Sequence, residues 1–328
     1  MFGSQSVRGI TGIAGMTLAL VASVSGCAST QPSNSDLALN VVATTTQVGD
    51  FTHQVGGETI ELTTLLSPGA SAHAFEPTQA DMVSLAEADV LVINGLNLEP
   101  FVDDVVATSG FAGTIIDAST GLHVEESGSS VEDEHDHGGT NPHIWTSPVM
   151  AAEMVNTIAA GMSDVAPEYR ETFSQNAEAY VVKLTALDAW VAENFAAVPE
   201  NERLFVSGHN SLEYFLDEYG ITFVGSILPS FEDNAEPSVA QVNQLIDHIN
   251  RLGVKAIFVE SSMNPKTAAR IAEQTGAVLI DHDVIYADSL GAAGSGAETY
   301  IAATIANTRT ILEAWGYTPT PLPSELRS

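Results

Sequence analysis

Residues 167–199 read PEYRETFSQNAEAYVVKLTALDAWVAENFAAVP, and this stretch decides how the chain is organised. It is rich in Ala, Glu, Leu and Gln and has no internal Gly or Pro, so it predicts one long helix from about Pro167 to Ala197. Pro167 suits a first helical turn and Pro199 marks the stop. At ~1.5 Å per residue, such a helix is about 45 Å long and can span a two-lobed molecule. Its apolar residues recur three, four or seven positions apart as one buried stripe, namely Tyr169, Phe173, Tyr180, Leu184, Leu187 and Val191.

On both sides of this helix, short β-rich runs alternate with helical patterns, which favours parallel sheets covered by helices. The sequence therefore predicts an α/β protein with two Rossmann-like lobes, residues 37–165 and 199–328, joined by a rigid linker helix at residues 166–198. The strands expected are Leu39–Thr45, Thr59–Leu66, Val90–Asn94, Thr114–Asp117, Leu204–Ser207, Ile221–Val224, Ala256–Glu260 and Ala277–Ile280. The other helices expected are Thr78–Ala88, Leu98–Thr108, Ser211–Tyr219, Val239–Arg251, Pro265–Gln274 and Glu298–Trp315.

Acidic residues dominate the charge, with 42 Asp and Glu against 10 Lys and Arg and a formal net charge of −32. A surface this negative repels nucleic acid and anionic lipid and attracts cations, so we expect no nucleic-acid partner. A solvated acidic coat, such as one adapted to high salt, explains the charge without making the coat itself a binding site.

The N-terminal segment has the pattern of an export signal. Arg8 is the only charged residue before Cys27, an apolar and small-residue run follows it, and the run ends in Val24-Ser25-Gly26-Cys27. This pattern resembles a bacterial lipobox, so we expect a signal peptide at residues 1–26 and lipidation of Cys27. An ordinary signal peptide or an N-terminal membrane helix is the alternative. Cys27 is the only cysteine, and the polar stretch 27–36 reads as a flexible tether.

Three histidines and one aspartate follow predicted strands. His73 lies in the loop after the second strand, His143 lies between the fourth strand and a helix, and His209 ends the first strand of the second lobe. Asp288 follows the last strand of that lobe. Ligands of open α/β sheets bind outside the carboxyl ends of the strands, so the four residues can converge in the cleft between the lobes.

Imidazole nitrogens suit zinc, copper, iron and nickel, whereas a carboxylate oxygen also serves manganese. Three His and one Asp can form a near-tetrahedral site with bonds of ~2.0–2.2 Å. Such a shell has no compulsory open position for a reactive water, so it indicates that the ion is held rather than used in catalysis.

Several motifs, in order and spacing, resemble the metal-specific solute-binding proteins of bacterial ABC importers, the ZnuA/TroA-like family. The resemblance covers essentially everything after the tether. The motifs are His73-Ala74-Phe75-Glu76-Pro77-Thr78, Asn94-Gly95-Leu96-Asn97-Leu98-Glu99-Pro100-Phe101, Asn141-Pro142-His143-Ile144-Trp145, Ser207-Gly208-His209 with Tyr214-Phe215, and Val259-Glu260-Ser261-Ser262.

The resemblance implies two lobes joined by a rigid helix and a single metal ion in the cleft, with His73, His143, His209 and Asp288 as its ligands. Manganese-selective members often have glutamate where His209 stands, so the histidine favours Zn2+, with Mn2+ or iron as the alternative. Many members have Asp where this chain has Asn141. A role of that aspartate in supporting a metal ligand, without binding the metal itself, therefore does not carry over directly to this position.

The family also implies delivery of the ion to an ABC permease by a protein anchored at the outer face of the cell membrane or in the periplasm. We expect a monomer that is not an enzyme. Glu99 and Trp145 are expected to shape or support the lobes.

An acidic loop, residues 127–140, contains His135 and His137 between the fourth strand and His143. Zinc-binding members of the family often carry a loop of this kind, and it predicts a weak auxiliary metal site. A solvated loop with incidental histidines is the alternative.

Two other classes of function need features that the sequence does not specifically provide. A secreted zinc hydrolase needs a general base beside a metal-bound water, and the sequence has no His-Glu-x-x-His or Gly-x-Ser-x-Gly motif. A surface adhesin is the other candidate, because some relatives were first described in that way, but no residue specifically supports it.

Overall fold

The computed structural model describes residues 39–124, 140–228, 237–260, 266–280 and 284–327. The expected signal peptide, the tether with Cys27, and the loop histidines His135 and His137 lie outside these residues. Within the described part of the chain, no helix combines the length and the hydropathy needed to cross a membrane.

The first half of the described chain is built on a parallel sheet of four strands in the order β2-β1-β3-β4. In the central strand β1, Val41 pairs with Leu62 on one side and with Val90 on the other. Val41 and Val90 are both buried, as expected for parallel strands covered on both faces. The strands are β1 (Leu39–Ala43), β2 (Ile60–Thr64), β3 (Val90–Ile93) and β4 (Thr114–Asp117).

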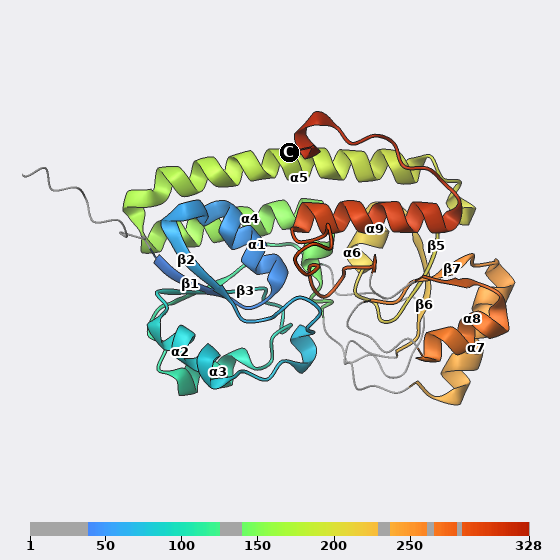
Figure 1. Cartoon of the computed structure of the whole chain (residues 1–328), viewed down its shortest axis with the longest axis horizontal. Helices are drawn as coiled ribbons and strands as arrows, with labels where there is room; N and C mark the ends of the chain where they lie inside the picture. The colour runs from blue at the N-terminus through green and yellow to red at the C-terminus, as the bar shows by residue number, and fades with distance from the viewer. Residues whose placement is uncertain (1–38, 125–139, 229–236, 261–265, 281–283, 328) are drawn as a thin grey trace, which may run out of the picture. The chain divides into compact units, whose positions relative to one another are not determined.

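Helices cover both faces of this sheet, with α1 and α4 on one side and α2 and α3 on the other (Figure 1). Their bounds are α1 (Thr46–Gly56), α2 (Gln79–Glu87), α3 (Val102–Ser109) and α4 (Pro148–Val165).

Helix α1 begins directly after β1, where the Thr45 side chain accepts a hydrogen bond from Val48 N at 3.2 Å. This helix was not predicted from the sequence, because three consecutive threonines continue the strand pattern and Gly49 weakens the helical signal. The packing requires Gly49, since a Cβ atom there would lie 2.5 Å from Thr64 Oγ1 on β2.

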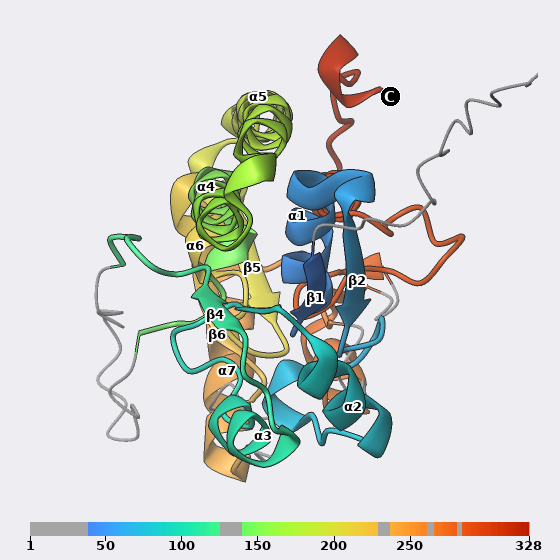
Figure 2. The ribbon, with the colours of Figure 1, turned by 90° about the vertical axis from the view of Figure 1, so that its left-hand side faces the viewer.

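Helix α5 (Arg170–Ala196) has 27 residues and is about 40 Å long at ~1.5 Å per residue. It packs along α4 (Figure 2), and it also contacts α1 in the first half and α9 in the second. It starts three residues later than predicted because residues 167–169 form a separate 3-10 turn. The expected long helix between the two halves is confirmed.

The second half contains two parallel strand pairs, β5-β6 and β7-β8. A hydrogen bond of 2.9 Å from Phe258 N to Val206 O joins the pairs. Strands β7 and β8 are shorter than predicted. Past Ile257, a side chain binds the backbone after β5. Glu260 Oε2 accepts a hydrogen bond from Gly208 N at 3.1 Å. The elements are β5 (Leu204–Ser207), α6 (Glu213–Glu218), β6 (Thr222–Ser226), α7 (Val239–Leu252), β7 (Ala256–Ile257), α8 (Lys266–Thr275), β8 (Val278–Leu279) and α9 (Tyr300–Trp315).

Candidate metal centre

Four side chains from four separate segments meet where the two halves of the chain come together. They are His73, in a 3-10 turn after β2; His143, between β4 and α4; His209, two residues after β5; and Asp288, in the loop before α9. Each offers one ligand atom, and these atoms all lie within 4.8 Å of one another. His73 is half-buried and the other three are buried. Among the described residues, no second group of three or more His, Cys, Asp or Glu side chains is arranged in this way.

The distances between the ligand atoms suit a four-coordinate ion. The Nε2 atoms of His73 and His143 are 3.1 Å apart. Asp288 Oδ1 lies 3.2 Å from His209 Nε2 and 3.6 Å from His143 Nε2. A tetrahedral zinc ion with bonds of ~2.0–2.1 Å separates its ligand atoms by about 3.3–3.4 Å. These three separations are therefore close to those of a tetrahedral cation, and since all four ligand atoms lie within 4.8 Å of one another, the remaining pairs have to close by at most about 1.5 Å around a bound ion.

Asn141 sets the tautomer of His143. Its Oδ1 lies 2.7 Å from His143 Nδ1 and accepts from His143 N at 3.0 Å. Its Nδ2 donates to Glu213 Oε2 at 2.7 Å and to Asn210 O at 2.8 Å. Because both of these partners are acceptors, the amide orientation is determined, and Oδ1 must accept the proton of Nδ1. His143 Nε2 is therefore the ring nitrogen that can bind a metal ion.

The neutral amide of Asn141 thus supplies the acceptor that the family aspartate would offer. An aspartate here would place a carboxylate against Glu213 Oε2, so the departure from the family pattern matches its surroundings. Asn141 thus contacts both the His143 ring and Glu213, although it departs from the family aspartate.

His209 is held from the side opposite its Nε2 atom. Glu260 Oε1 lies 3.7 Å from His209 Nδ1, and the same oxygen accepts from Ser211 Oγ at 3.0 Å. The Ser207 hydroxyl donates to the His209 carbonyl at 2.6 Å. Glu260 therefore faces the Nδ1 side of the imidazole while Nε2 faces Asp288, and Ser207 holds the backbone of His209.

The loop carrying Asp288 is tied to the first half of the chain. Ala287 O accepts from Trp145 Nε1 at 3.0 Å and from Gln47 Nε2 at 2.9 Å. Trp145 therefore has the supporting role expected of it. Gln47 was not singled out from the sequence, because its role depends on helix α1, which was not predicted.

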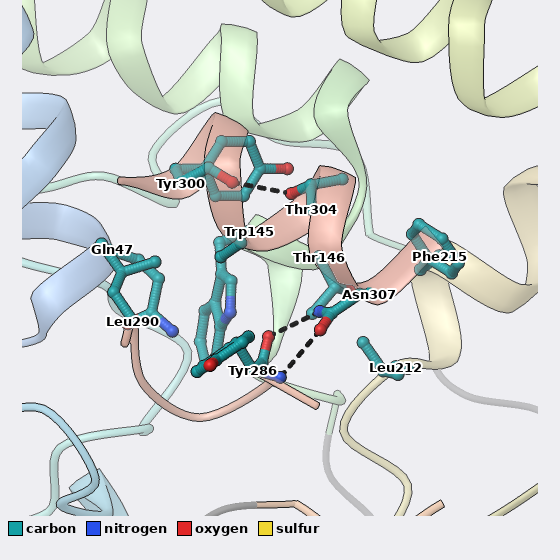
Figure 3. Close-up of a pocket in the computed structure, with 11 residues that line it drawn as sticks. Gln47, Trp145, Thr146, Leu212, Phe215, Tyr286, Leu290, Tyr300, Thr304 and Asn307 are labelled. Carbon is teal, nitrogen blue, oxygen red and sulfur yellow. Dashed lines mark hydrogen bonds between the residues drawn. The ribbon is translucent and has the colours of Figure 1, made fainter. Parts of the chain in front are cut away.

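A small cavity lies behind this loop, between Trp145, Tyr286 and Tyr300 (Figure 3). Figure 3 also shows Asn307 bonded to the backbone of Tyr286, with Tyr286 N donating to Oδ1 at 2.8 Å and Nδ2 donating to Tyr286 O at 2.7 Å. Helix α9 therefore fixes the base of the Asp288 loop from the second half of the chain.

The site favours a neutral imidazole and an ionised carboxylate. Burial lowers the pKa of His143 well below its ordinary value, and repulsion from His209 lowers it further. Burial by itself would raise the pKa of Asp288, but the nearby His209, His143 and His73 outweigh burial and lower it. Neutral imidazole nitrogen and ionised carboxylate oxygen are the forms that bind a metal ion.

Several proteins of known name resemble this chain. It is 30% identical over 301 residues to the manganese-binding lipoprotein MntA of Bacillus subtilis (strain 168), covering 89% of this chain and 94% of MntA. It is 29% identical over 301 residues to the iron-binding protein YfeA of Yersinia pestis, covering 90% of this chain and 92% of YfeA. It is 30% identical over 245 residues to the zinc-binding lipoprotein AdcA of Streptococcus pneumoniae serotype 4 (strain ATCC BAA-334 / TIGR4), covering 73% of this chain and 48% of AdcA.

The solved structure of the periplasmic zinc binding protein TroA from Treponema pallidum has the same fold. It superimposes with a TM-score of 0.73 at 24% identity and covers 84% of this chain and 98% of TroA. The sequence profile of the family described as zinc-uptake complex component A, periplasmic (ZnuA), matches residues 41–314. A match over this much of the chain confirms the resemblance seen in the sequence motifs, and the protein belongs to the ZnuA/TroA-like family of metal solute-binding proteins.

Proposed function

We propose that this protein binds one transition-metal ion through His73, His143, His209 and Asp288 and passes it to an ABC importer in the membrane. The observation that carries the proposal is the meeting of four ligand atoms, from segments far apart in sequence, within 4.8 Å of one another. Burying His143, His209 and Asp288 so close together, with the half-buried His73 beside them, is costly unless the four side chains share a cation.

Zinc is the ion that this donor set favours. Three imidazole nitrogens are borderline donors, and together with one carboxylate oxygen they form a donor set that is common for four-coordinate Zn2+. Manganese is the alternative, because a carboxylate oxygen also serves Mn2+ and because relatives such as MntA are named as manganese-binding. The name of YfeA keeps iron as a further alternative.

The proposed role is binding without catalysis. Four protein ligands complete the tetrahedral shell, whereas catalytic zinc sites keep one position for water. Glu260 is a further buried carboxylate, but it lies beside His209 Nδ1, on the side of the ring away from the proposed metal position. It is therefore placed to orient the ring rather than to activate a metal-bound water.

Lipidation of Cys27 would anchor the protein at the outer face of the cell membrane, close to the permease that receives the ion. The pattern Val24-Ser25-Gly26-Cys27 supports the anchor. We also propose that the protein works as a monomer and that His135 and His137 provide a weak auxiliary site.

The test is elemental analysis of protein purified without added metal, followed by competition between zinc and manganese for the chelated protein. We expect one equivalent of metal per chain and a preference for zinc. His209→Ala should abolish tight binding, whereas His123→Ala, which removes an exposed histidine, should leave it unchanged. Equal metal content in wild type and His209→Ala would contradict the proposed ligand set.

A further inference from the structure

The turn at residues 95–97 has an unusual backbone conformation. Gly95, Leu96 and Asn97 are three consecutive left-handed residues, with φ of 90°, 53° and 61°. Glycine adopts this region freely, but a leucine rarely does, so the surrounding structure must hold the turn in place. A Cβ atom at Gly95 would lie 2.0 Å from Asp117 Oδ1, so a larger residue would have to displace the Asp117 side chain and would also strain the backbone.

The buried carboxylate of Glu99 closes this turn. Its Oε1 accepts from Asn94 N at 2.7 Å and from the Thr44 hydroxyl at 2.5 Å, and its Oε2 accepts from Gly95 N at 3.3 Å. Glu99 is only 6% exposed, so these hydrogen bonds form in a medium where they are strong. Glu99 therefore fixes the backbone of Asn94 from inside the lobe.

The side chain of Asn94 connects the turn to the segment that carries His143. Asn94 is fully buried, and its Nδ2 donates to Pro142 O at 2.9 Å and to Gly95 O at 3.1 Å. Pro142 O also accepts from Ile144 N at 2.8 Å, which closes a tight three-residue turn centred on His143. The φ and ψ of His143, −80° and 46°, are close to those of an inverse γ-turn.

We propose that Asn94, held by Glu99 and the left-handed turn, is a positioning residue that fixes the backbone of the metal ligand His143. Asn141 orients the ring of His143 from one side, and Asn94 holds the carbonyl that precedes it from the other. A ligand ordered before the ion arrives loses less conformational entropy on binding, so the arrangement should raise affinity without touching the metal. The inference rests on the proposed function, because it concerns the same metal centre.

Asn194 provides the matched control. It is also buried, at 3% exposure, and its Nδ2 donates to Trp190 O at 2.7 Å and to Thr320 Oγ1 at 3.0 Å, while its Oδ1 accepts from Thr320 N at 2.8 Å. It lies at the carboxyl end of α5, and its hydrogen bonds reach none of the four proposed ligands. Asn94→Ala and Asn194→Ala therefore remove the same kind of buried hydrogen bond, and only the first touches the segment of a proposed ligand.

The experiment measures zinc affinity by chelator competition and the visible absorption spectrum of the Co2+-loaded protein, together with the melting temperature of the metal-free protein. We expect Asn94→Ala to lower zinc affinity about 10–100-fold, the range typical of outer partners of metal ligands. Its Co2+ bands should shift, since the His143 ring is less well placed. Asn194→Ala should lower the melting temperature but keep the affinity within about threefold and the Co2+ spectrum unchanged.

A second pair of variants keeps the test sharp if Asn94→Ala does not fold. Glu99→Ala should weaken zinc binding and shift the Co2+ bands, whereas Glu99→Gln, which keeps an acceptor for Asn94 N, should restore both. Equal affinity losses in the Asn94 and Asn194 variants, or an unchanged Co2+ spectrum in both Asn94→Ala and Glu99→Ala, would overturn the inference. Absence of metal binding by the wild-type protein would instead contradict the proposed function.

Discussion

Replacement of Glu99 by glutamine should change how the stability of the metal-free protein depends on pH. Burial raises the pKa of Glu99 from 4.5 to about 7, against the lowering effect of its hydrogen bonds from Thr44, Asn94 N and Gly95 N. At about 1.4 kcal/mol per pKa unit, the difference between the folded and unfolded states corresponds to about 3 kcal/mol. Glutamine has nearly the same shape and does not titrate.

The free energy of unfolding should fall as the pH rises, because the pKa of Glu99 is higher in the folded protein than in the unfolded chain. Between pH 4.5 and pH 7 the folded protein holds a proton on Glu99 that the unfolded chain has lost, so stability falls as the pH rises. This contribution is fully present below the unfolded pKa and is lost once the pH passes about 7. About 2.5 kcal/mol of this contribution to the unfolding free energy is lost between pH 5 and pH 8.5. This pH range lies above the sequence pI of about 4.2.

The assay is urea unfolding of wild type and Glu99→Gln in the presence of a chelator, at several pH values from 5 to 8.5. The unfolding free energy of the variant should gain about 2.5 kcal/mol relative to wild type across this range. Hydrogen bonds lost in the variant shift its whole curve and do not affect this difference. Glu153→Gln, an exposed position on α4, should give a curve parallel to wild type. Parallel curves for Glu99→Gln and wild type would refute the reasoning.

Three further predictions concern metal, charge and salt. Free zinc at 100 times its dissociation constant should stabilise the protein by about 2.7 kcal/mol in thermal melts. His143→Ala should abolish this gain, and an equal gain in the variant would contradict the role of His143 as a ligand. Asn141→Asp should destabilise the metal-free protein by about 1–3 kcal/mol at pH 8, because it places a carboxylate against Glu213. Recovery in the double variant Asn141→Asp/Glu213→Gln checks the pair, and additive effects would exclude the repulsion. Raising NaCl from low concentration to about 0.5 M should raise the melting temperature, because salt screens the repulsion among the acidic residues that give the net charge of −32. An unchanged melting temperature would show that this repulsion does not destabilise the fold.

Much of the fold could be predicted from local patterns. The helix around residues 167–199 was predicted because a long stretch of strong helix formers lacks Gly and Pro. The strands of the first half were predicted because buried parallel strands are nearly continuous apolar runs. Helix α1 escaped prediction because its threonines and Gly49 suit a strand and a turn as well as a helix. Gly49 is needed only because α1 packs closely on Thr64, a contact that no local pattern shows.

The candidate ligands were also named from the sequence, since each follows a predicted strand and lies in a family motif. Their supporting residues were harder to predict. Gln47 bonds to a carbonyl 240 residues away, and Asn94 bonds to one 48 residues away. Residue type and spacing give no signal for such contacts, because an asparagine or glutamine is equally common on a solvated surface.

The sequence by itself determined the residue types of the site and the elements that carry them, because helical and strand periodicity and motif chemistry are local properties of the chain. Only the tertiary structure decided that the ligand atoms of His73, His143, His209 and Asp288 meet within 4.8 Å, and which groups hold them there. The physical reason is that a hydrogen bond or an ion site needs positions accurate to a few tenths of an ångström. That accuracy arises when the two halves pack around α5 and bring distant segments into contact.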